Sequence, residues 1–298
     1  MKRYALRTFV ALVAALALLV AIAPTAEART DTKGKRVLLL HGYQPWGTPT
    51  SPCDMWGAME SALQAQGFTG PKTSVQYYDA QVACDVSVIP YGSASAHHAP
   101  SGGVHDRYVS IRHLGYELAW MIYERYSRYG ETVDVVAHSM GGLIVRYALA
   151  QVQAGNAEFP PYLYVEDVVT LGTPHNGSGY ASWCWTTQCG EMSPGSSLLS
   201  WLRGNAWNPQ VSGGTDWTAM GSYEDGTVSE SSAVDMGAAH KVLYQPAAGI
   251  GHSDYYTSTS TASSAPVYYS DGGGAWYSWS TGYWPVRWSA NSLYVGSW

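Results

Sequence analysis

Three side chains in this 298-residue sequence have the types and the chain order that nucleophilic catalysis on an acyl group requires. Ser139 lies in "VAHSMGG", where a run of apolar β-branched residues meets a helical pattern. A serine hydroxyl is a weak nucleophile, so it needs a histidine as base and a carboxylate that orients this base. His252 in "GIGHSD" and Asp225 in "YEDGTV" are our candidates for these two roles.

The surroundings of Ser139 predict a nucleophile elbow, a sharp turn that projects the serine hydroxyl from the end of a strand. Strand and helix converge closely at such a turn, and the two glycines after Met140 meet the need for small neighbours. Ala137 stands where the pattern usually has glycine. The Met140 N–H, at the beginning of the helix, can stabilise an oxyanion. We expect the second donor to be the N–H of Tyr43, in the loop after "LLLHG".

Strands and helices alternate along the part of the chain that must position these groups. Hydrophobic periodicity predicts strands in 35–41, 73–79, 132–139, 164–172, 216–224 and 240–245, and helices in 54–68, 106–130 and 140–153. We expect Asp54 and Asp106 to begin the first two helices, and residues 85–104 to form a long loop. Strands joined by crossover helices pair in parallel, so the expected fold is α/β, with helices on both faces of one mostly parallel sheet.

The pieces "VLLLHGY", "VAHSMGG" and "VVTLGTPHNGS", in this order, resemble the secreted bacterial lipases and esterases of the α/β-hydrolase fold. The resemblance covers roughly residues 35–252 and is strongest to the small types whose elbow reads Ala-His-Ser-Met-Gly, so Ala137 has precedent there. It implies an oxyanion hole made by the backbone of Tyr43 and Met140. The Asp-Gly-x-Val arrangement at Asp225 is similar to the acid loop of these enzymes.

Position along the strands separates the candidate bases and acids. In this fold the catalytic groups stand at the carboxyl ends of strands, in the order Ser, acid, His. His252 and Asp225 each follow a predicted strand, whereas His240 and Asp167 come at the beginning of theirs. His175 also follows a strand and is the best competitor to His252, but it precedes any suitable acid.

Some alternatives stay open at the level of sequence. Glu224 adjoins Asp225 and is the main alternative acid, and Asp225 could be a plain turn residue in Asp-Gly. Asp254 is too close to His252 in sequence to be an attractive partner. His138 adjoins the serine, so we expect its side chain to point away from the hydroxyl.

We expect no metal and no organic cofactor. No CxxC spacing suggests a zinc site, and His97 and His98 form a loop pair without a nearby carboxylate cluster, which is more often solvated than metal-bound. The proposed chemistry of serine, histidine and aspartate needs neither.

The beginning of the chain predicts export. Basic residues precede an apolar run over 9–23, and "AEA" at 26–28 has the small-x-small spacing of a cleavage site. We therefore expect a Sec-type signal peptide over 1–28, cleaved after Ala28, and a secreted protein. A membrane anchor is the alternative, but the run is shorter than the roughly 20 residues that a span needs.

The four cysteines all follow the predicted signal peptide. An even number in an oxidising compartment suggests two disulfides, although four cysteines allow three connectivities. We expect Cys53–Cys84 and Cys184–Cys189, because each pair lies within one local region; free buried thiols are the alternative.

The expected organisation is a catalytic domain over 29–254 with a cap-like insertion at 173–216. The segment 255–298 interleaves Ser, Thr and Gly with five tryptophans, and we expect it to pack on the core as a β-rich extension. A surface that binds carbohydrate or another polymer is the alternative role for this extension.

These features together predict a carboxylic-ester hydrolase, a lipase or broad-specificity esterase that acts through an acyl-enzyme. A phospholipase, a polyester depolymerase or an acyltransferase would use the same three residues, and a non-catalytic polymer-binding protein is an alternative of another class. The expected partner is an ester with an apolar acyl chain, at a lipid–water interface or a polymer surface. A net charge of −6 does not favour nucleic acid. We expect a monomer without stable membrane insertion.

Overall fold

The structure, a computed structural model, describes residues 32–45, 52–92 and 95–294. The expected signal peptide over 1–28 lies outside the described residues, as does Trp298 of the aromatic extension. Within the described ranges, the structure contains no helix with the length and apolar character that crossing a bilayer requires.

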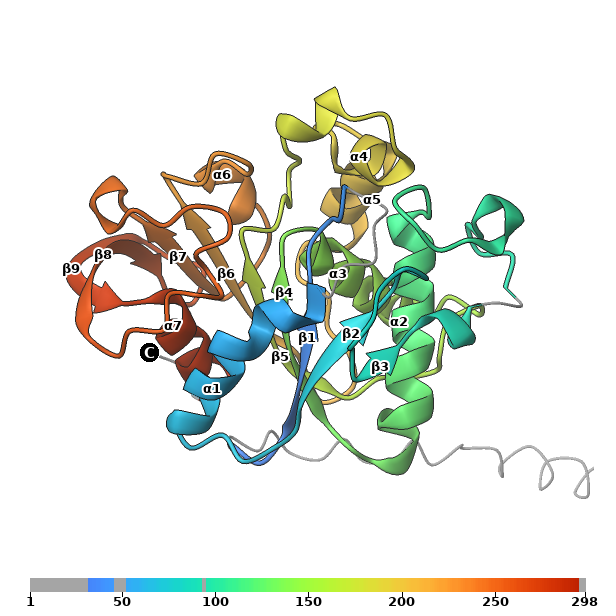
Figure 1. Ribbon diagram of the computed structural model, residues 1–298, viewed down its shortest axis with the longest axis horizontal. Helices are drawn as coiled ribbons and strands as arrows, with labels where there is room; N and C mark the ends of the chain where they lie inside the picture. Colours follow the sequence, from blue (N-terminus) through green and yellow to red (C-terminus); the bar gives the residue numbers. More distant parts are fainter. Residues whose placement is uncertain (1–31, 46–51, 93–94, 295–298) are drawn as a thin grey trace, which may run out of the picture.

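A nine-stranded sheet runs through the molecule in the order β3-β2-β1-β4-β5-β6-β7-β8-β9 (Figure 1). Its strands are β1 Arg36–Leu40, β2 Lys72–Gln76, β3 Val86–Ser87, β4 Val133–His138, β5 Val165–Leu171, β6 Asp216–Ser222, β7 His240–Tyr244, β8 Ser263–Ser270 and β9 Trp276–Tyr283. The first seven strands pair in parallel, and β8 and β9 continue the sheet in antiparallel pairing. Because β4 to β7 are parallel neighbours, the loops after them meet at one edge.

Helices cover both faces of this sheet. They are α1 Gly57–Ala65, α2 Ile111–Arg125, α3 Met140–Gln153, α4 Thr187–Met192, α5 Ser197–Asn205, α6 Glu230–Ala233 and α7 Pro285–Ser292. Alternate residues of β1 face opposite ways: Leu38 belongs to the core shared with α2 and α3, and Leu39 to the core shared with α1 and α7. The expected α/β-hydrolase architecture, a mostly parallel sheet between two helical layers, is confirmed.

The helix beginnings differ from the sequence-based expectation. Ser110, not Asp106, begins α2, since its hydroxyl accepts the N–H of Arg112 while Asp106 accepts that of Tyr108 in a turn before the helix. Asp54 lies within a short 3₁₀ turn, and α1 begins after Trp56 without a side-chain cap. In both places a turn residue close to the helix shares the preferences of a cap, so sequence alone does not separate them.

Two stretches are more ordered than the sequence predicted. The expected long loop at 85–104 contains the short strand β3, whose two residues pair with the end of β2. The irregular region 173–216 contains α4 and α5, with Thr186 and Ser196 capping their first turns. Both helices are short, and their apolar spacing is too brief for a periodic signal.

The aromatic extension continues the main sheet. β8 pairs with β7, β9 pairs with β8, and α7 returns across one face of the sheet. Trp288 on α7 is buried, and its ring lies 5.8 Å from Trp279 and 5.5 Å from Tyr283. These aromatic rings therefore fill the space between α7 and the last two strands.

Both expected disulfides are present. The Cα atoms are 5.3 Å apart in Cys53–Cys84 and 5.9 Å apart in Cys184–Cys189, within the range that the bond requires. The first joins the turn before α1 to the loop after β2, and the second closes a short loop onto α4.

Candidate active site

Ser139 joins β4 to α3 in a backbone conformation that few residues other than glycine adopt. Its φ is 53° and its ψ is −125°. The bend is closely surrounded: a Cβ on Gly141 would lie 2.8 Å from the Leu40 carbonyl oxygen, and a Cβ on Gly142 would lie 2.0 Å from Thr173 Oγ1. Glycine at both positions lets β1 and the turn after β5 approach the serine, as a nucleophile elbow requires.

The side chains of Ser139, His252 and Asp225 form a continuous hydrogen-bonded series. His252 Nε2 lies 3.0 Å from Ser139 Oγ, and His252 Nδ1 lies 2.8 Å from Asp225 Oδ2. The three residues follow β4, β7 and β6, whose ends lie at one edge of the sheet. With Nδ1–H donating to the carboxylate, Nε2 can accept the serine proton. This arrangement can activate the hydroxyl for attack on a carbonyl carbon.

Asp225 is a buried and fully hydrogen-bonded carboxylate. Oδ1 accepts the N–H groups of Thr227 and Val228, both at 2.9 Å, and Oδ2 also accepts the Tyr255 hydroxyl at 3.3 Å. Burial by itself raises the pKa of Asp225, but the hydrogen bonds and charge of His252 and the two backbone donors outweigh it, so the pKa lies below its ordinary value. Asp225 is therefore a fixed negative charge beside the imidazole.

Residues 64–193 match the protein family described as "Putative serine esterase (DUF676)". This span covers less than half of the chain and includes the elbow, with β4, Ser139 and α3. The sheet and the elbow have the α/β-hydrolase arrangement. The protein has the α/β-hydrolase fold, and the matched segment is similar to serine esterases. No curated protein sequence matches the chain.

Several solved structures are similar to the chain at low identity. The mature lipase BlEst2 of Bacillus licheniformis is 17% identical with a TM-score of 0.43, covering 70% of this chain and 82% of its own. The product of the gene lin2722 of Listeria innocua is 16% identical with a TM-score of 0.44, covering 75% and 88%. The phospholipase PlaB of Legionella pneumophila is 14% identical with a TM-score of 0.41, covering 62% and 39%. These values are too low to bear on the substrate.

The competing histidines of the chain lie away from the serine hydroxyl or contact other groups. His175 is buried between Arg146, which donates to its Nδ1, and Thr170, whose hydroxyl lies 3.2 Å from Nε2. Burial and the charge of Arg146 hold the pKa of His175 well below its ordinary value. His240 pairs with Asp216 at the beginning of β6 and β7, the edge opposite to the elbow.

The competing carboxylates are also engaged elsewhere. Asp167 lies at the amino-terminal part of β5, where it and two further carboxylates surround Lys35. Asp254 accepts the N–H of Gly251 and so shapes the loop that carries His252. The contact to His252 Nδ1 is made by Asp225, the neighbour of Glu224.

His138 contacts the loop that carries His252. Its ring lies 4.7 Å from that of His252, and its Nε2 donates to the His252 carbonyl at 2.8 Å. Burial and the neighbouring His252 lower the pKa of His138 to about 3. A neutral ring therefore supports the loop of His252 without adding charge beside it.

His97 is not a solvated loop residue. It is buried, with Nδ1 2.9 Å from a Glu158 carboxylate oxygen and Nε2 3.2 Å from the Tyr147 hydroxyl. Its neighbour His98 is exposed, as expected for the pair. The partner Glu158 lies too far along the chain for local spacing to indicate it.

The turn after β1 packs directly against the serine, where the Tyr43 N–H was expected as an oxyanion donor. A Cβ on Gly42 would lie 2.8 Å from the Ser139 Cβ and 3.3 Å from its Oγ. The absence of a side chain at Gly42 thus lets the backbone that leads to Tyr43 reach the nucleophile.

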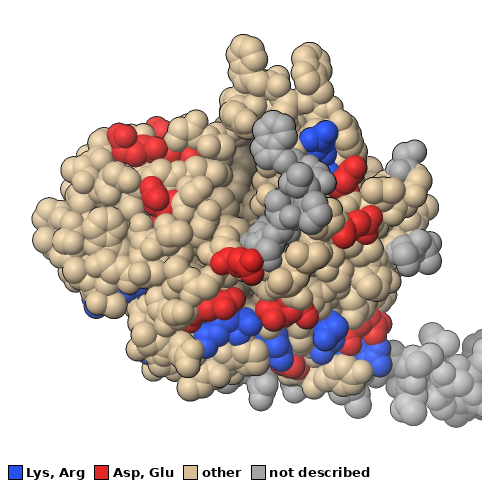
Figure 2. All heavy atoms as spheres, in the orientation of Figure 1, with Lys and Arg blue, Asp and Glu red and all other residues tan. Residues whose placement is uncertain are grey.

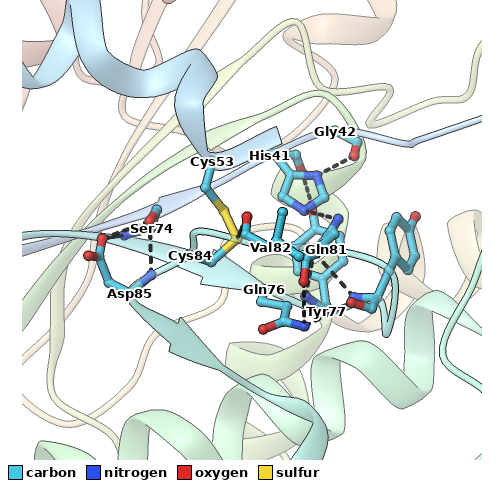
Figure 3. Close-up of a disulfide and its surroundings, with 11 residues drawn as sticks. His41, Gly42, Cys53, Ser74, Gln76, Tyr77, Gln81, Val82, Cys84 and Asp85 are labelled. Atoms are coloured by element: carbon cyan, nitrogen blue, oxygen red, sulfur yellow. Dashed lines mark hydrogen bonds between the residues drawn. A yellow bond between two sulfur atoms is a disulfide. The ribbon is translucent and has the colours of Figure 1, made fainter. Parts of the chain in front are cut away.

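His41 and Gln81 fix the backbone of this turn (Figure 3). Gln81 Oε1 accepts the N–H groups of Tyr77 and Tyr78, at 3.0 and 3.2 Å. The Gln81 amide nitrogen therefore donates to His41 Nε2 at 2.7 Å, which leaves the imidazole proton on Nδ1. His41 Nδ1 in turn donates to the Gly42 carbonyl at 2.7 Å. None of these positions was singled out from the sequence for this role.

The Gly42–Tyr43 peptide bond connects this hydrogen-bond network to the N–H group expected to stabilise the oxyanion. Because the Gly42–Tyr43 peptide is planar and trans, a carbonyl held toward His41 makes the Tyr43 N–H point the opposite way. Burial lowers the pKa of His41 to about 4 against the opposing effect of its two hydrogen bonds, so the ring is neutral near pH 7. The direction of the Tyr43 N–H is therefore set by His41 and, behind it, by Gln81.

We predict that Gln81→Glu lowers kcat about 10- to 100-fold on a soluble nitrophenyl ester with little change in KM. The carboxylate keeps the acceptor for Tyr77 and Tyr78 but removes the donor to His41 Nε2. The proton of the neutral imidazole then favours Nε2, where it donates to the carboxylate, so Nδ1 no longer donates to the Gly42 carbonyl. Loss of an oxyanion donor costs roughly 100- to 1000-fold, and misalignment costs less. Steady-state kinetics and thermal melts measure both effects.

The control is Gln66→Glu, the same change at a residue whose amide donates to the Ala62 carbonyl in α1. It should keep the wild-type kcat. Wild-type kcat in a well-folded Gln81→Glu protein would contradict the role given to His41.

Proposed function

We propose that the protein is a secreted serine carboxylic-ester hydrolase, a lipase or a broad-specificity esterase that works through an acyl-enzyme. The observation that carries the proposal is the pair of contacts of His252, at 3.0 Å to Ser139 Oγ and 2.8 Å to Asp225 Oδ2. The match to a serine esterase family over the elbow supports the same chemistry.

In the proposed reaction, Ser139 Oγ attacks the ester carbonyl while His252 Nε2 takes its proton. Asp225 keeps the imidazole in the productive tautomer and stabilises the imidazolium. His252 then protonates the departing alcohol, and a water molecule activated by the same nitrogen attacks the acyl-enzyme to release the acid. The backbone N–H groups of Tyr43 and Met140 would stabilise the oxyanion of each tetrahedral intermediate.

Secretion is part of the proposal. Two disulfides suit an oxidising compartment, and the composition of residues 1–28 is that of a cleavable signal peptide. Amino-terminal sequencing of the protein from culture medium should begin at Arg29.

We predict that Ser139→Ala lowers kcat about ten-thousand-fold or more, because no other group replaces the nucleophile. Asp225→Asn should have an effect of similar order, since the amide stabilises the wrong tautomer of His252. Hydrolysis of a nitrophenyl ester measures both. Retention of the original rate by Ser139→Ala would refute the assignment of the nucleophile.

Glu224→Gln is the matched control for the acid, because Glu224 is the adjacent carboxylate and the open alternative. It should keep kcat within about twofold of the wild type. A larger loss in Glu224→Gln than in Asp225→Asn would reverse the assignment of the acid.

A surface feature favours esters held at an interface. Trp183 and Trp185 flank a disulfide cysteine and are 83% and 94% exposed. Thr186, next along the chain, lies 3.2 Å from the Tyr43 hydroxyl, so these rings stand close to the proposed oxyanion turn. Figure 2 shows the projecting top of this face, above α4, without charged side chains. We propose that the two tryptophans hold the enzyme on an insoluble ester, at a lipid–water interface or a polymer surface.

We predict that the double variant Trp183→Ser, Trp185→Ser lowers the rate on an emulsified long-chain ester about tenfold or more. The large apolar area of two indoles supports adsorption and is not needed for a dissolved substrate. The rate on a soluble short-chain ester should change by about twofold or less. Trp276→Ser, a change at an exposed tryptophan on β9, should leave both rates unchanged. Equal losses on both substrates would contradict adsorption through these rings.

The alternative enzyme classes can be distinguished by their products. A phospholipase, a polyester depolymerase and an acyltransferase would share the acyl-enzyme and differ in the ester attacked or in the group that accepts the acyl chain. Product analysis with a phospholipid, a polyester film and an added alcohol separates them.

A further inference from the structure

Two histidines and a glutamate come together at the beginning of α2, away from the catalytic series. His105 lies in the loop before the helix, and His113 and Glu117 are one turn apart on α2. Each offers a ligand atom, and these atoms all lie within 4.8 Å of one another. His105 Nε2 is 2.7 Å and His113 Nε2 is 3.5 Å from Glu117 Oε1. All three side chains are at most 3% exposed.

The tautomer of His113 is fixed by its other nitrogen. Nδ1 lies 2.5 Å from the His97 carbonyl oxygen, which can only accept, so Nδ1 carries the proton. With the proton on Nδ1, Nε2 is the nitrogen that faces the Glu117 carboxylate, which is an acceptor. A proton or a metal ion between Nε2 and the carboxylate would satisfy both in this buried site.

A proton on His105 by itself does not satisfy both contacts of Glu117. It would satisfy the 2.7 Å contact between His105 and Glu117 and leave His113 Nε2 without a donor. Glu117 Oε2 is also buried and has no hydrogen-bond partner among the described residues. An unsatisfied buried acceptor costs about 1–3 kcal/mol, and more when it is charged.

We propose that His105, His113 and Glu117 bind a divalent transition-metal ion, for which zinc has the best-matched chemistry. Imidazole nitrogen and carboxylate oxygen are zinc ligands, and atoms around a tetrahedral zinc stand about 3.4 Å apart. The observed 2.7 and 3.5 Å lie on either side of that spacing. The hydrogen bond from His113 Nδ1 to a carbonyl is the outer support that metal-binding histidines usually have.

The surroundings suit a buried, structural metal site. A Cβ on Gly92 would lie 2.3 Å from Glu117 Cγ, so the backbone after β3 packs on the glutamate and limits its movement. A cavity of about 760 Å³ is lined by Val104, Asp106 and Arg112, which adjoin His105 and His113 in sequence. The metal would connect the loop at 101–110 to α2. At the beginning of α2, the Ser110 hydroxyl and the Ile111 N–H also donate to Glu191 of α4.

The test uses the full chain without a histidine tag. After dialysis against a chelator, calorimetric titration with zinc should show one ion bound per chain, and elemental analysis should find the same stoichiometry. The midpoint of thermal unfolding should be higher with zinc than in chelator. Cobalt loading should give the visible ligand-field absorption of a site with nitrogen and oxygen ligands.

Variants distinguish this site from adventitious binding. His113→Ala and Glu117→Gln should weaken zinc binding about 100-fold or more, since even outer-shell losses cost 10- to 100-fold. His98→Ala, at an exposed histidine near the cluster, should bind zinc as the wild type does. Activity on a soluble ester should change little on metal removal, because Ser139 and His252 belong to another part of the fold.

If a variant fails to fold, the zinc uptake and the unfolding midpoint of the wild-type protein still test the proposal. No zinc uptake by the chelator-treated wild type, or an identical unfolding midpoint with and without zinc, would overturn the proposal. Equal zinc uptake by Glu117→Gln would also overturn it. None of these outcomes depends on whether the protein hydrolyses esters.

Discussion

Ser139 holds a backbone conformation that costs a non-glycine residue on the order of 1–3 kcal/mol, and the packing around it sustains that strain. Two glycines after the serine and one before it, Gly42 in the turn after β1, let three backbone segments close on the bend. The hydroxyl oxygen is consequently held at one point at the edge of the sheet. His252, Asp225 and the Tyr43 backbone can take part in the proposed reaction only because this oxygen is held at a fixed position among them.

The groups around Ser139 combine one permanent charge with neutral buried rings. Asp225 stays ionised because its hydrogen bonds outweigh the cost of burial, whereas burial keeps His41 and His138 neutral with pKa values of about 4 and 3. A positive neighbour would oppose the charge that His252 gains in the proposed reaction. Neutral histidines can instead act as rigid hydrogen-bond donors, one to the Gly42 carbonyl and one to the carbonyl of His252.

The fold and the three candidate catalytic residues could be predicted from the sequence, because their signals are local or follow a fixed order along the chain. The strands β1, β2 and β4 to β7 and the helix α3 follow from hydrophobic runs, and Ser139, Asp225 and His252 from their positions after strands. The supporting polar residues were missed, since Gln81 meets His41 only through the folding of the loop after β2. The cluster at Glu117 was missed for the same reason: half of its signal, His-x-x-x-Glu on one helix, is common, and His105 joins it only in three dimensions.

The structure of the protein after reaction with a fluorophosphonate tests the central claim most directly, because the adduct mimics the tetrahedral intermediate. The account predicts phosphorus bonded to Ser139 Oγ, with the phosphoryl oxygen within hydrogen-bond distance of the backbone nitrogens of Tyr43 and Met140. His252 Nε2 should remain beside the Ser139 oxygen. Labelling at another residue, or a phosphoryl oxygen that points away from both backbone nitrogens, would contradict it.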